Sequence, residues 1–131
     1  MSILTTLIQN ASNFISLKPS DKSSIMAAEC QLGLVFAPDY KEYLSTFGAA
    51  SFDGRELTGV CQSERLSVVS QTERARLLYP HLPKDAYVIE DVGFDHIVIV
   101  QNASGKVFSY GPTDSGKEIA DSLQDYLFSE A

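Results

Sequence analysis

The sequence has few of the residues from which metal and redox sites are built. Its 131 residues include two cysteines, Cys30 and Cys61, and two histidines, His81 and His96. No Cys-x-x-Cys pair occurs and neither cysteine has a histidine nearby, so the pattern indicates neither a zinc site nor a dithiol redox motif. We expect two reduced, buried structural thiols and no cofactor or metal. Neither histidine has an evident catalytic partner, which predicts a protein that is not an enzyme.

The sequence also lacks a long apolar run. The longest is Ile97-Val98-Ile99-Val100, far short of the ~20 residues of a membrane helix. The first ten residues, MSILTTLIQN, carry no basic residue and are interrupted by polar ones, unlike a secretory signal peptide. We expect no membrane segment and a cytoplasmic protein.

Basic residues are scarce in the last third of the chain. Residues 1–84 hold eight acids and eight bases, whereas residues 85–131 hold nine acids and two bases, Lys106 and Lys117, giving a net charge of −7. A nucleic-acid binder needs a basic surface to displace counterions from phosphates, so nucleic acid is an unsuitable partner. A basic protein is a better match, and a merely solvated acidic face is the alternative.

Helical periodicity dominates the first half of what is predicted to be a single domain, residues 1–131. Apolar spacing predicts a first helix over residues 3–15. Ser20-Asp21 opens a second helix, which Gly33 stops. Pro38 begins a third, and Gly48 supplies its C-terminal stop.

Turn and strand patterns dominate the remainder. Asp53-Gly54 predicts a two-residue hairpin, and the capping box Ser70–Glu73 predicts a short helix to Tyr79. Three strands, 86–92, 96–102 and 106–110, predict an antiparallel meander, and a final helix is predicted to begin at Ser115. The predicted fold class is α+β, with helices packed against an antiparallel sheet.

The stretch from Gly111 to Lys117 has the glycine and lysine spacing of a phosphate-binding loop. It departs from that motif at Glu118, where a Ser or Thr hydroxyl is needed for magnesium, and Asp114 adds negative charge to the cradle. A nucleotide-binding enzyme is therefore the least favoured hypothesis.

Acidic residues gather around the predicted link between the first two strands of the meander. Glu90, Asp91 and Asp95 flank this link, but they lack the regular oxygen-ligand spacing of a divalent cation site. A patch facing a basic partner is the better interpretation, because clustered charges raise association rates and reject wrong partners. The predicted partner-binding residues are Glu90, Asp91, Asp95 and Asp114.

The run Ala28-Glu29-Cys30-Gln31-Leu32-Gly33-Leu34-Val35-Phe36-Ala37-Pro38-Asp39-Tyr40-Lys41-Glu42-Tyr43-Leu44, followed by Gly48, resembles the opening signature of the SUKH superfamily. That superfamily includes the yeast cell-wall synthesis regulator and many bacterial immunity proteins. Residues 87–91, 104–108 and 122–127 are similar to the family's strands and closing helix.

The resemblance implies a SUKH-like α+β fold and no shared catalytic residues. For most bacterial members it implies neutralisation of a polymorphic or contact-dependent toxin, often a nuclease, by direct binding. An adaptor or scaffold of the cell-wall-regulator type, without a toxin partner, is the alternative. The motif residues Gly33, Pro38, Tyr40 and Gly48 are interpreted as fold determinants.

Overall fold

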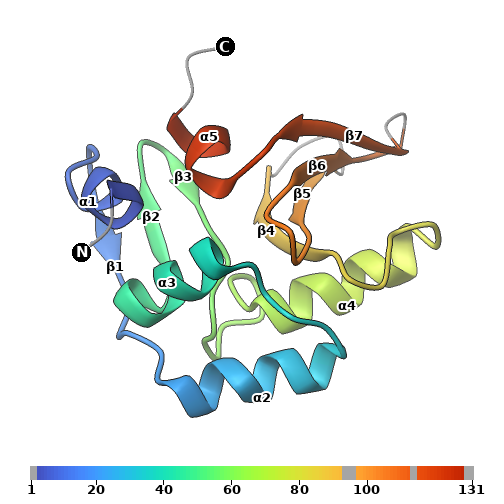
Figure 1. The fold of residues 1–131 in the computed structure, drawn as a ribbon, viewed down its shortest axis with the longest axis horizontal. Coiled ribbons are helices and arrows are strands. Elements are labelled where there is room, and N and C mark those ends of the chain that lie inside the picture. The colour runs from blue at the N-terminus through green and yellow to red at the C-terminus, as the bar shows by residue number, and fades with distance from the viewer. Residues whose placement is uncertain (1–2, 93–96, 113–114, 129–131) are drawn as a thin grey trace.

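The structure is a computed structural model that describes residues 3–92, 97–112 and 115–128. Within these residues, helices and two antiparallel sheets form the predicted α+β fold (Figure 1). Sheet 1 has the strand order β1-β2-β3, and sheet 2 has the order β4-β5-β6-β7. Along the chain the elements are α1 (Ile3–Gln9), β1 (Ile15–Ser16), α2 (Lys22–Leu32), α3 (Pro38–Phe47), β2 (Ala50–Phe52), β3 (Arg55–Glu56), α4 (Val68–Leu78), β4 (Tyr87–Asp91), β5 (Val98–Gln101), β6 (Val107–Tyr110), β7 (Ser115–Ala120) and α5 (Leu123–Phe128).

The first helix is shorter than predicted, because it ends at Gln9 and the chain then forms β1. Ser12 donates its N–H to Asp53 Oδ1 at 3.0 Å, and Asp53 donates its own N–H to the Ser12 carbonyl at 2.8 Å. Asn13 has a φ of 58°, which a continuing helix does not allow. Contacts with the distant hairpin therefore override the local helical periodicity.

The predicted ends of α2 and α3 are confirmed. Asp21 caps α2 by accepting the Ser24 N–H at 2.7 Å, and Gly33 ends it in the left-handed conformation with a φ of 69°. Pro38 lies in the first turn of α3, and Gly48 follows its last residue with a φ of 73°.

The predicted hairpin is also confirmed, because β2 and β3 pair Phe52 with Arg55 across a turn in which Asp53 and Gly54 both have positive φ. The start of α4 was predicted three residues late. Its cap is Ser67, whose Oγ accepts the Ser70 N–H at 3.2 Å.

The predicted meander forms β4, β5 and β6, but the predicted helix at Ser115 is wrong. Residues 115–120 form a fourth strand, β7, which pairs Lys117 with Ser109 of β6. Gly116 has a φ of 91°, outside the helical region. The final helix begins at Leu123, and Ser122 Oγ caps it by accepting the Asp125 N–H at 3.0 Å.

Strands β4 and β5 of sheet 2 are buried on both faces, which explains their near-continuous apolar runs, whereas the outer strand β7 is largely exposed. Tyr87, Ile99 and Val107 belong to the main core with side chains of α1, α2, α3 and α5. Val88 and Val100 belong to a second cluster that includes Ala75 of α4. The signature run, which includes α3, thus lies against one face of sheet 2.

Candidate interaction site

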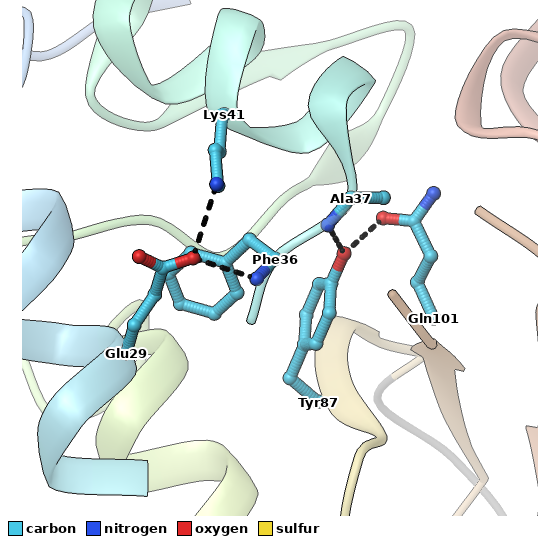
Figure 2. Close-up of polar contacts among 6 residues, drawn as sticks. All are labelled: Glu29, Phe36, Ala37, Lys41, Tyr87 and Gln101. Carbon is cyan, nitrogen blue, oxygen red and sulfur yellow. Dashed lines mark hydrogen bonds and ion pairs between the residues drawn. The ribbon is translucent and has the colours of Figure 1, made fainter. Parts of the chain in front are cut away.

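The signature run links α2 to α3 through the carboxylate of Glu29. Its Oε2 accepts the backbone N–H of Phe36 at 2.8 Å and lies 3.4 Å from Lys41 Nζ. Figure 2 shows Glu29 reaching from α2 toward Lys41 and the Phe36 backbone. The Glu29 side chain is only 14% exposed, so these contacts balance a charge that is largely removed from water. The motif acid therefore fixes the turn between the two helices.

A second set of contacts connects the start of α3 with sheet 2 and α5. Tyr87 Oη accepts the Ala37 N–H at 2.9 Å and donates to Gln101 Oε1 at 2.6 Å (Figure 2). Gln101 donates through Nε2 to Asp39 Oδ1 at 3.0 Å, and Asp39 Oδ2 accepts the Leu123 N–H at 2.9 Å. The motif aspartate thus joins three elements that are far apart in the sequence.

The two motif tyrosines are bonded around Thr58. Thr58 Oγ1 donates to the Val88 carbonyl at 2.7 Å, so the Tyr40 hydroxyl is the donor in its 2.8 Å bond to the same oxygen. The Tyr43 hydroxyl donates to the Thr58 carbonyl at 3.0 Å and accepts the Ala50 N–H at 2.8 Å. These hydroxyls hold the segment after β3 against α3.

Burial raises the pKa of Tyr40, Tyr43 and Tyr87 well above the ordinary value of 10.0. All three phenols stay protonated near neutral pH and act as hydrogen-bond donors. The three hydroxyls therefore stabilise the interior of the fold, because each of them already makes a hydrogen bond to another group of the protein.

Gly33, Pro38, Tyr40 and Gly48, the predicted fold determinants, lie at helix ends or inside the core. A Cβ on Gly48 would lie 2.0 Å from the Lys18 carbonyl oxygen, so only glycine fits where these two segments cross. Gly33 has open space around it and a positive φ.

The sequence did not indicate the groove that lies beside this motif. We define the α2 groove as two adjoining hollows, of about 390 and 340 Å³, that share Met26 and Glu29. Met26 is 52% exposed and Val35 is 55% exposed, so the groove has apolar walls open to solvent. The only hint in the sequence was the four-residue spacing of Lys22, Met26 and Cys30 on α2. The groove is lined by Lys22, Ile25, Met26, Glu29, Cys30, Gly33, Leu34, Val35, Lys41, Glu42 and Ser45.

Glu90, predicted to face a partner, lies inside the protein. It is 8% exposed, and its Oε1 accepts the Tyr126 hydroxyl of α5 at 2.6 Å. The guanidinium of Arg55 lies 5.4 Å from the centre of the Tyr126 ring. Burial, and next the nearby Glu90 charge, raise the pKa of Tyr126. This placement removes Glu90 from the predicted acidic surface.

The exposed acids of the last third do not form one compact patch. Asp91 ends β4 opposite Val98, whereas Asp121 follows β7 beyond the opposite end of the sheet. Because β4 and β7 are also the two outer strands, these acids lie at diagonal corners, on the order of 20 Å apart from strand spacing and rise. Asp125 is exposed on α5, and Asp95 and Asp114 lie outside the described residues.

The prediction of two buried cysteines is wrong, because Cys30 is exposed in the α2 groove and Cys61 is partly exposed. Burial nevertheless raises the pKa of the Cys61 thiol. His81 is exposed, and His96 lies outside the described residues. No group of three or more His, Cys, Asp or Glu that could hold a metal ion occurs in the described part of the chain.

The glycine-rich stretch 111–117 does not have the strand-loop-helix context of a phosphate-binding loop. It links β6 to β7, and its last residues, Ser115 to Lys117, already pair with β6. No helix within residues 3–92, 97–112 and 115–128 has the length and apolar character needed to span a membrane.

By its fold and its motif contacts the chain is a small α+β protein in which the signature residues connect the helices to two antiparallel sheets. The chain matches the family model described as SMI1-KNR4 cell-wall, SUKH_5, over residues 2–130 and belongs to this family. The resemblance of the signature run to the SUKH superfamily is thereby confirmed.

Among solved structures, the chain is similar to a crystal structure of a protein from Pseudomonas syringae pv. tomato. The TM-score is 0.72 at 16% sequence identity, and the similarity covers 94% of this chain and 92% of that chain. At this identity the similarity concerns the fold alone. The search of curated proteins gives no match.

Proposed function

We propose that this chain is a bacterial immunity protein that neutralises a cognate toxin domain, such as a nuclease, by binding it in the cytoplasm without catalysing a reaction. The observation that carries the proposal is the excess of exposed carboxylates in the last third of a SUKH-family chain. Within its described residues the exposed acids are Asp85, Asp91, Glu118, Asp121 and Asp125, and the exposed bases are Lys106 and Lys117.

A cationic toxin domain is the partner that this charge distribution suits. Opposite charges steer the encounter and like charges reject wrong partners, while salt screens both effects over a Debye length of ~10 Å at 0.1 M. Lys106 already lies 3.6 Å from Glu118, so these two exposed charges largely offset each other. Asp91 at one corner of sheet 2, and Asp121 with Asp125 at the diagonal corner, are the exposed acids that we propose as contacts of a basic partner.

The test begins with the coding region immediately upstream, in which the proposal predicts a large secreted protein that ends in a small toxin-like domain. That domain is then co-expressed with the chain. We expect rescue of growth and a complex of the two purified proteins that weakens as salt is raised. Cell death despite a well-expressed, folded chain, or binding that salt leaves unchanged, would contradict the proposal.

Charge reversals at the two corners locate the contact. Asp91→Lys reports on one corner, and the double variant Asp121→Lys, Asp125→Lys reports on the other. Reversal at the contacting corner is expected to weaken binding about tenfold per residue. Glu73→Lys is the matched control, because Glu73 is an exposed acid on α4, outside the acidic third. Effects that follow only the charge change, with Glu73→Lys as damaging as Asp91→Lys and the double variant about twice as damaging, would point to net charge alone.

An adaptor or scaffold of the cell-wall-regulator type is the second candidate, favoured by the cell-wall description of the family that the chain matches. An adaptor predicts protein partners but no rescue from a neighbouring toxin. The co-expression experiment therefore separates the two candidates directly.

A further inference from the structure

The α2 groove is an exposed, partly apolar feature that the acidic-surface proposal does not use. In Figure 1, α2 lies along the outer edge of the molecule, beyond α3 and α4. Met26 and Val35 expose more than half of their surface there. Leu34 lines the same groove and is 9% exposed. Exposed apolar walls over an apolar floor are typical of a surface that another protein covers.

The charges around the groove are balanced, unlike those of the whole chain. Its lining holds two bases, Lys22 and Lys41, and two acids, Glu29 and Glu42. A strongly basic partner has no electrostatic reason to choose this neutral surface over the acidic third. Two copies of a chain with a net charge of −7 repel each other elsewhere, but here they can meet without a local excess of negative charge.

The groove is also complementary to itself under twofold symmetry. In an antiparallel pairing of two α2 helices with Met26 at the axis, Lys22 of one copy lies beside Glu29 and Cys30 of the other. Lys22 makes no ion pair with a described residue. Glu29 uses Oε2 for Phe36 and Lys41, and neither contact uses Oε1. Each copy thus offers a base and a carboxylate oxygen that match those of its twin.

From this geometry we infer that the α2 groove is the interface of a homodimer, in which each copy lays its α2 against the α2 groove of the other. Met26 packs against its symmetry mate at the centre, and two equivalent pairs of Lys22 with Glu29 flank it. The interface leaves the acidic corners of sheet 2 uncovered, so dimerisation and toxin binding use separate surfaces.

Sedimentation velocity across a range of chain concentrations tests the dimer. The wild-type chain should sediment as a dimer that dissociates on dilution. Met26→Asp buries two like charges at the axis and should weaken association at least 100-fold, and Lys22→Glu should weaken it about tenfold. Leu77→Asp is the matched control, because Leu77 is 85% exposed on α4 and lies outside the α2 groove. Circular dichroism verifies that each variant is folded.

Disulfide trapping tests the symmetry independently. In a chain with Cys30→Ser and Cys61→Ser, Met26→Cys should cross-link nearly completely under mild oxidation, since the axis brings the two sulfurs together. Leu77→Cys in the same background should not.

A chain that is monomeric at every concentration, or a dimer that survives Met26→Asp, overturns the inference. If the wild-type chain is a monomer and its Met26→Asp variant loses toxin binding, the groove is the binding site of the toxin instead. Toxin binding retained by a folded Met26→Asp monomer, together with a wild-type dimer, supports the inference and leaves the proposed function intact.

Discussion

At the scale of single residues, the signature motif works by placing atoms where only one side chain fits. Glycine at position 48 is required twice, by a φ of 73° and by the Lys18 carbonyl oxygen that a Cβ would meet at 2.0 Å. That oxygen belongs to the backbone and cannot move away by a change of rotamer. Gly33 shares the positive φ, but the space that a Cβ would occupy there is open. Substituting alanine at the two positions therefore distinguishes the cost of backbone strain, which both share, from the cost of a steric clash, which only Gly48 has.

We predict that Gly48→Ala lowers the free energy of unfolding by ~3 kcal/mol or more. The alanine must adopt a strained positive φ, and the two backbone segments that cross here must also move apart. Gly33→Ala is the control and should cost about 1–2 kcal/mol, the strain alone. Urea denaturation followed by circular dichroism measures both. Equal losses in the two variants would show that the crossing at Gly48 relaxes freely.

At the scale of secondary structure elements, caps decide where helices begin. Two serines, Ser67 and Ser70, could serve as the N-cap of α4, and the capping box that begins at Ser70 is the stronger local pattern. The structure uses Ser67, because Ser67 N–H is held by the Ser63 carbonyl at 2.8 Å and Val68 N–H by the Gly59 carbonyl at 2.9 Å. These contacts fix the chain before Ser70 is reached, so the helix starts earlier.

Ser67→Ala is therefore predicted to destabilise the protein by about 1 kcal/mol through loss of the cap on α4. Ser70→Ala lies inside the helix and should change stability by less than about 0.5 kcal/mol. Thermal or urea unfolding of the two variants under identical conditions distinguishes them. A larger loss in Ser70→Ala would restore the capping box as the start of α4.

The elements that sequence patterns predicted well are those whose boundaries are set locally. Helix α2 begins after Asp21 and ends before Gly33 because of contacts within a few residues. The hairpin of β2 and β3 likewise turns at Asp53-Gly54 through local contacts. The misjudged segments depend on distant partners. Residues 115–120 have a plausible helix start, yet pairing with β6 makes them a strand. The burial of Glu90 depends on Tyr126, 36 residues away, which no local pattern reveals.

At the scale of the whole molecule, buried phenols bind α3 to both sheets. Tyr40 and Tyr43 reach Thr58 next to sheet 1, and Tyr87 of sheet 2 reaches the backbone before α3. Tyr126 adds a fourth phenol between α5 and β4. Burial raises the pKa of all four above 10.0, so the folded state holds these protons more tightly than the unfolded chain.

This difference predicts a steep loss of stability in alkali. Below pH 10 the phenols are protonated in both states, so the stabilisation is fully present. Above pH 10 the unfolded chain releases these protons first, and the free energy of unfolding falls by ~1.4 kcal/mol per pH unit for each phenol that stays protonated in the fold. Urea denaturation at stepped pH from neutral to alkaline measures the slope.

Tyr40→Phe isolates one contribution, because it keeps the ring in the core and removes one titrating group. Its stability should be lower than wild type near neutral pH, since one buried hydrogen bond is lost. Its slope above pH 10 should be shallower by ~1.4 kcal/mol per pH unit, which a purely structural effect would not change. The chain has six tyrosines, so the tyrosinate absorbance of Tyr40 is read as the difference between wild type and Tyr40→Phe, and this difference should appear only as circular dichroism is lost. A difference that appears while both chains are still folded would mean that Tyr40 titrates in place, contrary to its raised pKa.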